Sequence, residues 1–455
     1  MPSEYLTPVG AFLSLVSSTG TYAPGPAAAT GAAAAPATKN TVVAAVIVAL
    51  FVFAAVLSAA RKDITQGFDE VAHASYVAHI QTTGQAWPAL EQMRLLDPQT
   101  FQFTGAGNYL NHPPFFYALI AALGPIIAGH PQALIVDRLI NVAIAASGLA
   151  VLLGLGLAAH LTREEFYAYA VPLACIPVLA PIAGSVNNDN LAFLGGALAT
   201  LGVWQRVTTG RDGWLALALV GVIIASWAKL TGLLLTVPTV TCVIAYLMWR
   251  RRLSFGWTIV AAFAFAVAAA PYLIYFAHYG SPTPQTPAQI ALLADGARAA
   301  GWADLPRRSF PGYVVYFVVA FIADWMPALG ARSIFNYAML VIPVAALGCA
   351  VAGLALSLRR VWRRQETALD VVVGSGALAI AATFAIHIAY SYGRYAATGW
   401  LMDAYPRYYL PLAAIVPLAC LSLLVAIETP HRRNALLAFL IAGPVIFRIF
   451  GAPLG

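Results

Sequence analysis

The sequence predicts an all-α polytopic membrane protein, whose chain crosses the bilayer many times. Three observations lead to this fold class. The chain of 455 residues is 61% hydrophobic and only 9% charged, whereas soluble domains carry about 25% charged residues. Many apolar runs reach the roughly 17–25 residues that a helix needs to cross the hydrocarbon core. These runs are continuous, whereas the strands of a membrane barrel would show weak alternation.

The basic residues are expected to orient helices, not to bind nucleic acid. The formal net charge is +7, but most of the Lys and Arg lie in short loops, where they mark the cytoplasmic side. Cytoplasmic loops are therefore expected at 206–211, 250–252, 359–364 and 432–433. The cysteines lie in apolar runs without metal-ligand spacing, so we interpret them as small core residues: Cys175, Cys242, Cys349 and Cys420.

The apolar lengths between these loops predict about eleven transmembrane helices, with the N-terminus inside and the C-terminus outside. The stretch 214–249 is basic at both ends, so it must hold two short helices with their turn outside, near Lys229. Arg61-Lys62 would lie outside, against the positive-inside preference. The expected spans are 41–60, 139–159, 166–184, 190–205, 214–228, 231–248, 256–277, 336–358, 369–390, 408–427 and 434–450.

Two further apolar stretches, 115–129 and 313–329, have both flanks outside. We expect external juxtamembrane or re-entrant helices there, which are tolerated where the backbone packs on protein or lines a cavity. Residues 1–40 include an Ala/Pro/Gly/Thr-rich segment and are expected to be a disordered cytoplasmic segment. One transmembrane domain would then cover 41–455, with external loops at about 61–138 and about 278–335.

The acidic pair Asp69-Glu70 is the first candidate for chemistry. Ionised carboxylates are costly in hydrocarbon, so we expect this pair at the membrane face or in a polar cavity. His73 and Tyr76 follow at helical spacing, which places them on one face with Asp69. A carboxylate there can accept a proton from an attacking hydroxyl, and with an imidazole it can hold a divalent metal. The alternative is an interfacial helix whose acids only stabilise its N-terminus.

Two more polar groups are expected on the same outer face. His112 precedes two prolines that leave the first donors of a helix free, so it could bind a metal or orient a phosphate. Asn188-Asp189 lies between two spans and adds a second acid, Asp189, on the same face as Asp69. Paired carboxylates can bind a metal or sugar hydroxyls. The alternatives are an incidental histidine at a proline-started helix, and ordinary helix capping by Asn188 and Asp189.

Cations complete the set of polar groups on this face. Lys229 lies in an apolar run, which marks a functional candidate, although snorkelling to the interface is the alternative. Arg394 and Arg407 offer paired donors suited to phosphate. Tyr408 beside Arg407 also fits an interfacial aromatic belt, and Arg138 could equally be an interfacial anchor.

The ordered set of motifs resembles the GT-C superfamily of integral membrane glycosyltransferases, in particular bacterial relatives of the polyprenyl-phosphate-sugar transferases. The resemblance covers about residues 41–427 and rests on the acidic pair with its His and Tyr, then HPPFFY, DRLIN, NNDN, AKLTGL and YPRYYLP. The last motif reads Pro406-Arg407-Tyr408 where the family pattern has Gly-Arg-Tyr. A Gly-Arg-Tyr occurs upstream at Gly393-Arg394-Tyr395, which leaves open which arginine matches.

The resemblance implies a GT-C-type helical bundle that moves a sugar, with inversion, from a polyprenyl-phosphate donor to a glycan, lipid or protein acceptor. It implies Asp69 as general base, with Glu70 and Asp189 placing the acceptor or a metal, and Lys229 and Arg407 holding the phosphate. The tentative ligands of a divalent ion are Glu70, His112 and Asp189, and no organic cofactor is expected. The remaining substrate-binding candidates are His73, Tyr76, Arg138, Asn188, Arg394 and Tyr408.

The expected location is the bacterial inner membrane, among membrane lipids, with the active site on the outer face. Two alternatives stay open. A transporter or flippase of a lipid-linked sugar would show polar residues at several depths and internal repeats, and neither is evident in the sequence. A non-catalytic scaffold would leave the acidic pair and Lys229 without a purpose.

Overall fold

The computed structural model describes residues 35–323, 340–401 and 403–451. Within these ranges the chain is almost wholly helical, which confirms the predicted all-α fold. The elements are α2 (Ala35–Arg61), α3 (Glu70–Thr83), η1 (Leu90–Gln92), β1 (Arg94–Leu96), β2 (Phe103–Gly107), α4 (Phe115–Leu123), η2 (Pro131–Ala133), α5 (Leu134–Ala158), α6 (Arg163–Ala174), α7 (Leu179–Ala183), α8 (Asp189–Thr209), α9 (Asp212–Ala228), α10 (Leu230–Trp249), α11 (Phe255–Tyr279), α12 (Pro287–Ala299), α13 (Phe310–Ala323), α15 (Val341–Trp362), α16 (Ala368–Thr398), η3 (Pro406–Leu412), α17 (Ile415–Ala426), α18 (Pro430–Ile446) and η4 (Phe447–Gly451).

Fewer helices than expected meet the requirements of a full membrane span. In the described residues six are long and apolar enough, and the bent pair η3 and α17, with 65° between them, could form a seventh or a re-entrant segment. The count of about eleven is therefore not confirmed. The expected span 166–184 is divided into α6 and α7, α9 has only 17 residues, and α8, with 21 residues, is not apolar enough. The six are Lys39–Arg61, Pro131–Ala158, Leu230–Trp249, Phe255–Tyr279, Val341–Trp362 and Ala368–Thr398.

The two leftover apolar stretches form short helices. The stretch 115–129 contains α4, of nine residues, and the stretch 313–329 begins inside α13 and then leaves the described residues. Residues 1–34 also lie outside them, and α2 starts at Ala35, before the expected boundary at residue 40. The division into an N-terminal segment and one transmembrane domain stays a prediction.

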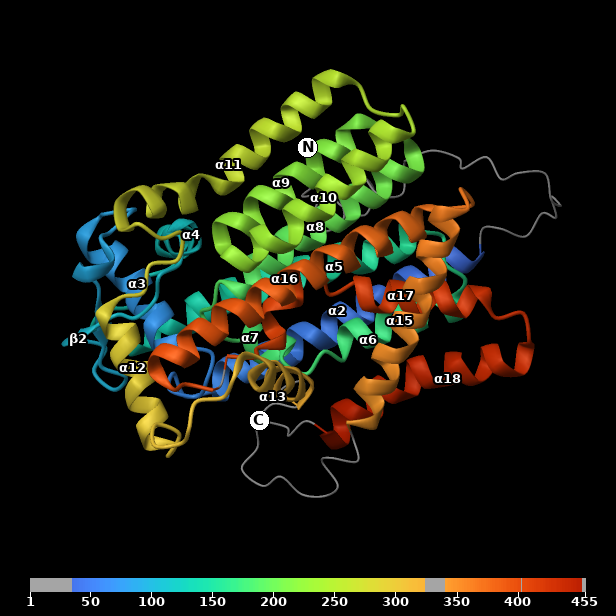
Figure 1. Cartoon of the computed structure of the whole chain (residues 1–455). Helices are drawn as coiled ribbons and strands as arrows, with labels where there is room; N and C mark the ends of the chain where they lie inside the picture. Colours follow the sequence, from blue (N-terminus) through green and yellow to red (C-terminus); the bar gives the residue numbers. More distant parts are fainter. Residues whose placement is uncertain (1–34, 324–339, 402, 452–455) are drawn as a thin grey trace, which may run out of the picture.

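A layer of α3, β1, β2 and α4 covers one end of the bundle, at the left of Figure 1. Its own hydrophobic cluster includes the buried Tyr76, Phe116 and Tyr117. The antiparallel pair β1–β2 in this layer was not predicted from the sequence. The C-terminal ends of α10 and α15, with their arginines, lie at the opposite end of the bundle (Figure 1). Polar groups and basic loops are thus separated as expected, while the assignment of the two ends to the two sides of a membrane stays a prediction.

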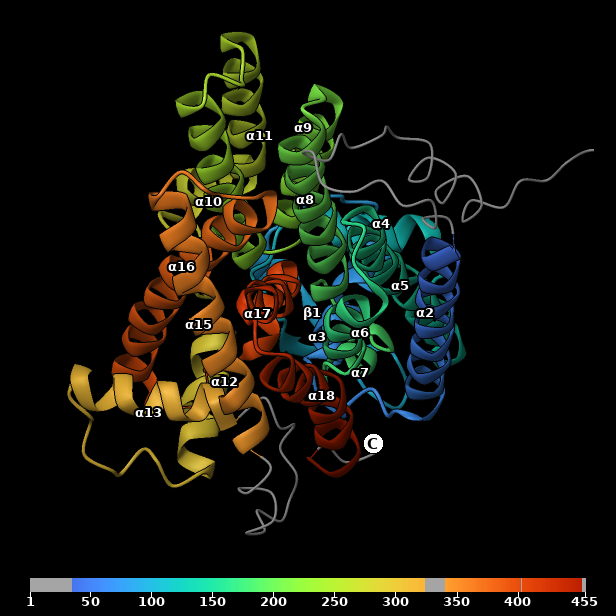
Figure 2. The same ribbon diagram turned by 90° about the vertical axis from the view of Figure 1, so that its right-hand side faces the viewer.

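Small residues let the central helices approach each other closely. A Cβ added to Gly195 or Gly221 would lie 2.4 or 2.5 Å from a backbone nitrogen across the α8–α9 contact, which is the small-residue packing typical of membrane helices. Gly196 performs the same task between α8 and η3, since its Cβ would lie 2.0 Å from the carbonyl oxygen of Pro411. The view of Figure 2 shows α2 at one edge of the bundle, beside α5, with α8 further inside. This close packing fixes η3 against the helix that begins at Asp189.

Candidate active site

A tight left-handed turn presents the acidic pair. Gly67, Phe68 and Asp69 have φ angles of 83°, 59° and 58°, a region that costs roughly 1–2 kcal/mol for each residue with a side chain. Asp69 is the N-cap residue of α3, yet its side chain makes no capping hydrogen bond. Asp69 therefore does not cap α3 through a side-chain hydrogen bond, although its charge lies at the N-terminus of the helix. The turn directs Asp69 and Glu70 to different surroundings.

Asp69 belongs to a network of alternating charges drawn from four parts of the chain. Arg407 Nη2 lies 3.2 Å from Asp69 Oδ2, and Arg407 Nε lies 3.8 Å from Asp189 Oδ2. Lys229 Nζ donates to Asp189 Oδ1 at 2.6 Å. The Asp69 side chain is 44% exposed, whereas the other three are 3–11% exposed. Asp69 is thus the carboxylate of this network that an incoming molecule can reach.

Aromatic rings surround the two cations. Lys229 Nζ lies 4.0 Å from the centroid of the Tyr408 ring. The guanidinium carbon of Arg407 lies 5.0–5.6 Å from the rings of Phe68, Tyr405 and Tyr408. Such rings stabilise cations through their negative faces, so they help to retain positive charge in a buried place.

Two buried polar atoms of this network have no hydrogen-bond partner in the described part of the chain. Among the described residues, Arg407 Nε and Asp189 Oδ2 are buried without a hydrogen-bond partner, and the 3.8 Å between them is too long for a hydrogen bond. Buried polar groups are normally satisfied, and an exception in a site calls for a missing partner. An anionic group beside Arg407 would supply an acceptor to its Nε–H, whereas the Asp189 oxygen is itself an acceptor and calls for a donor.

Glu70 has a different environment from its neighbour. Both of its carboxylate oxygens accept from Arg138, at 2.8 Å each, and Oε1 also accepts from the Val186 amide at 2.9 Å. Arg138 in turn donates to the carbonyls of Ala59 and Lys62. The residue is 1% exposed, so Glu70 and Arg138 join elements and present no free group to a ligand.

Lys62 lies beside this pair, 3.7 Å from Glu70 Oε2 and in contact with the Ser185 hydroxyl. Burial, partly offset by Glu70, lowers the pKa of Lys62 from 10.5 to about 8. Lys62 therefore adds a second cation beside Glu70, while its expected position on the outer side stays a prediction.

His73, Tyr76 and His112 pack together around Tyr117. His73 Nδ1 is 2.9 Å from the Tyr117 hydroxyl, and its ring stacks on that of His112 with 6.0 Å between centroids. The Tyr76 ring stacks on Tyr117 at 3.9 Å. Burial and then the charge of Lys229 hold the pKa of both histidines well below 6.5. The imidazoles are therefore neutral at pH 7 and add no charge to the site.

The last two predicted residues, Asn188 and Arg394, lie outside the charge network. Asn188 Nδ2 donates to the Ala228 carbonyl at 2.8 Å, which ties the start of α8 to the residue before Lys229. Arg394 Nε lies 3.5 Å from Asp403 Oδ2, and its contacts do not include Asp69. Of the two arginines that the sequence left open, Arg407 is the one beside the acidic pair.

The tentative metal ligands Glu70, His112 and Asp189 do not form a metal site. In the part of the chain that the structure describes, no three His, Cys, Asp or Glu residues are grouped so that they could hold a metal ion. The oxygens of Glu70 are engaged by Arg138, and those of Asp189 face Lys229 and Arg407. This donor set suits cations supplied by the protein itself.

Sequence reasoning missed several residues of the site. Phe68 stacks beside Arg407, Tyr109 donates to Asp69 Oδ1 at 3.2 Å, and Asn187 binds the Asp189 amide. Asn187 stood inside the predicted NNDN motif and could have been singled out there. Phe68 and Tyr109 carry no pattern of their own, because their role arises from a turn and from packing between distant segments.

No protein-family model and no curated protein matches this chain. Two solved structures that it resembles are of ArnT from Cupriavidus metallidurans. The apo structure covers 85% of this chain and 78% of its own chain, with 12% identity and a TM-score of 0.35. The structure bound to undecaprenyl phosphate covers 89% of this chain and 85% of its own, with 14% identity and a TM-score of 0.31.

Proposed function

We propose that this chain is a GT-C-type membrane glycosyltransferase. It moves a sugar from a polyprenyl-phosphate donor to a hydroxyl of a glycan, lipid or protein acceptor, with inversion, at the outer face of the bacterial inner membrane. The observation that carries the proposal is the network of Asp69, Arg407, Asp189 and Lys229. It combines one accessible carboxylate with two buried cations, of which Arg407 has an Nε–H without a hydrogen-bond partner among the described residues.

In the proposed reaction Asp69 accepts the proton of the acceptor hydroxyl. The acceptor oxygen forms a bond to the anomeric carbon of the donor sugar, and the bond from this carbon to the phosphate oxygen breaks. The electron pair leaves with the polyprenyl phosphate, whose charge Arg407 and Lys229 stabilise. Attack opposite to the leaving group inverts the anomeric configuration. Asp189 lies between the two cations and keeps both in place.

Donor binding and base activation are linked in this proposal, because the Arg407 guanidinium donates to Asp69. A donor phosphate competes with Asp69 for the guanidinium, since phosphate accepts paired hydrogen bonds from arginine. Once Arg407 turns to the phosphate, Asp69 is free to take a proton. Glu70, predicted as a second catalytic acid, is proposed instead to position the turn through Arg138, and no step is assigned to a metal ion.

The variant Asp69→Asn tests both parts. We expect the rate of sugar transfer to fall by about 10²–10⁴-fold, the value of a general base. Binding of polyprenyl phosphate should become tighter by up to about fivefold, since Arg407 loses a half-exposed ion pair. Transfer is measured on purified protein with a polyprenyl-phosphate sugar, and binding with polyprenyl phosphate alone.

Glu91→Gln is the matched control, since Glu91 is an exposed acid of the same end layer and takes part in no ion pair among the described residues. It should leave both quantities unchanged. Full transfer by Asp69→Asn would remove Asp69 as the base. Movement of the donor across liposome membranes without any transfer would instead support the flippase alternative.

A further inference from the structure

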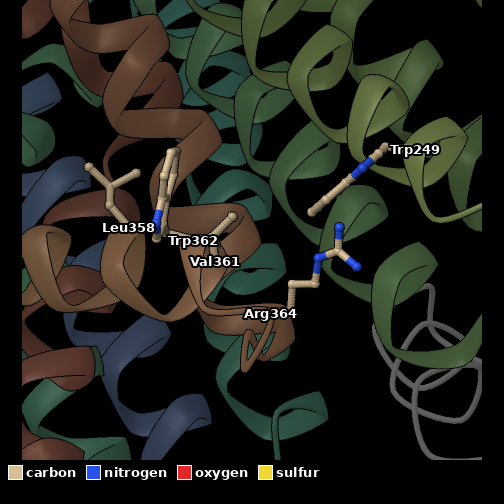
Figure 3. A pocket seen from close by; sticks show the side chains of 5 residues that line it. All are labelled: Trp249, Leu358, Val361, Trp362 and Arg364. Atoms are coloured by element: carbon tan, nitrogen blue, oxygen red, sulfur yellow. The ribbon is translucent and has the colours of Figure 1, made fainter.

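A second polar and aromatic site lies at the end of the bundle opposite to Asp69. A pocket of about 540 Å³ opens between the C-terminal ends of α10 and α15. Its lining residues are Trp249, Leu358, Val361, Trp362 and Arg364. Figure 3 shows the indole of Trp249 beside the guanidinium of Arg364, with Trp362 and Val361 across from them on α15 and Leu358 on the far side of Trp362. One wall is thus cationic and the others are apolar.

The acids near this pocket are already paired. Glu366 binds Arg250 at 2.6 Å and accepts from the Tyr246 hydroxyl, and Asp370 binds Arg360 at 2.6 Å. Among the described residues no carboxylate pairs with the other arginines at this end, which are exposed. These are Arg251, Arg252, Arg359, Arg363 and Arg364. The surface around the pocket therefore carries excess positive charge that no part of the described chain neutralises.

Two details show that this is more than a basic loop that orients helices. Arg251 and Arg364 follow the last turns of α10 and α15 in the left-handed region, with φ of 55° and 58°, at a position where glycine is favoured. The guanidinium of Arg364 lies 5.5 Å from the Trp249 ring, and that of Arg250 lies 5.4 Å from the same ring. The indole thus holds two arginines at the rim of the pocket, and cations over an aromatic face are stabilised there.

The large apolar side chains at the pocket are exposed, which fits contact with lipid. Trp362 is 89% exposed, Trp249 53% and Leu358 51%. Tryptophans prefer the level of lipid headgroups, and arginine offers planar donors that match a phosphate. Basic pockets between membrane helices are known to take lipid headgroups. The combination calls for a ligand with an anionic phosphate and an apolar body.

We propose that this pocket binds an anionic phospholipid of the same membrane, with its phosphate on Arg364 and the neighbouring unpaired arginines, and its glycerol and upper acyl chain on Trp249, Trp362 and Leu358. The occupant is a resident lipid, separate from the donor of the proposed reaction. Binding there would fasten the C-terminal ends of α10 and α15 to each other.

Native mass spectrometry of the full-length protein, with added phosphatidylglycerol or phosphatidylcholine, tests the proposal. We expect phosphatidylglycerol to bind more tightly, and Arg364→Gln to weaken it by about tenfold, the effect of losing a charged hydrogen-bond pair. Arg432→Gln is the matched control, because Arg432 is an exposed arginine of α18 away from the pocket. It should leave phosphatidylglycerol binding unchanged.

A second variant and a second ligand make the outcome decisive. Trp362→Ala should also weaken phosphatidylglycerol, because it removes the apolar wall and keeps every charge. Equal binding of both lipids, or equal loss in Arg364→Gln and Arg432→Gln, would overturn the proposal. Inorganic phosphate that binds as tightly as the lipid would show that a free anion is the ligand. None of these readouts depends on sugar transfer, so their failure is separate from a failure of the proposed function.

Discussion

At the scale of single residues, Asp69 and Glu70 show how neighbours in the sequence acquire different roles. Asp69 is half exposed and shares one arginine with Asp189, while Glu70 is buried and accepts both donors of Arg138. A carboxylate can act as a base only when substrate reaches it and its lone pairs are available. Asp69 is therefore the acid that can act as a base, and Glu70 is the acid that stabilises the fold.

The buried, neutral side chains of His73 and His112 predict that the free energy of unfolding decreases in mild acid. The pKa of His73 and His112 is held well below 6.5 in the folded protein by burial. The unfolded chain therefore binds more protons than the folded one once the pH falls below about 6.5. The free energy of unfolding should then drop by about 1.4 kcal/mol per pH unit for each histidine.

Thermal unfolding at about pH 7.5 and at about pH 5.5, on either side of the ordinary histidine pKa, checks this. In His112→Phe, where a ring remains to stack on His73, the loss of stability between the two pH values should be smaller than in the unchanged protein. The same loss in both proteins would mean that His112 does not contribute.

At the scale of elements, the contact between α8 and η3 brings Arg407 to Asp189. Gly196 permits it, because no side chain stands between the helix and the Pro411 carbonyl. The left-handed turn before α3 orients Asp69 toward Arg407. Close backbone packing thus decides how the charged residues of different elements meet.

Gly196→Ala should therefore lower both stability and transfer. Its methyl group would lie 2.0 Å from a backbone oxygen, so η3 must shift and carry Arg407 away from Asp189. Gly348→Ala in α15 is the control, since a Cβ there meets nothing within 4 Å and alanine favours a helix by about 1 kcal/mol over glycine. Melting temperature and transfer rate should fall only in the first variant, and equal behaviour of both would contradict the role of this contact.

At the scale of the whole molecule, the Glu70–Arg138 pair connects the end layer to the bundle. It joins α3 to α5, to the end of α2 through Ala59, and to the segment before α8 through Val186. One buried ion pair thus joins α3, α5, the end of α2 and the segment before α8 next to the charge network.

Breaking this pair should be costly. Glu70→Gln leaves Arg138 buried without its counter-charge, and we expect a loss of about 3–5 kcal/mol in the free energy of unfolding. The double variant Glu70→Gln with Arg138→Met should recover part of the loss, because no unpaired charge remains. Arg298→Met, in the exposed pair with Asp295, should cost less than about 1 kcal/mol. A mild effect of Glu70→Gln would show that the pair does not support the fold.

The sequence by itself determined the class of the molecule and the chemical type of its site. Apolar length and low charge predict membrane helices through the cost of placing polar groups in hydrocarbon, and this prediction is confirmed. The same cost made Asp69, Asp189, Lys229 and Arg407 visible as exceptions, and the structure places them in one network. The expected number of spans was not confirmed, because apolar length does not distinguish a helix that crosses lipid from a short or broken one packed inside protein.

Only the tertiary structure decided which charges pair. The separation of the acidic pair depends on Arg138, 68 residues along the chain from Glu70. The contacts of Arg407 with Asp69 and Phe68 join segments that lie more than 300 residues apart. Sequence spacing describes neighbours along one helix, whereas these contacts follow from a left-handed turn and from glycines that let distant backbones touch. The roles of individual residues could therefore not be predicted from sequence pattern and composition.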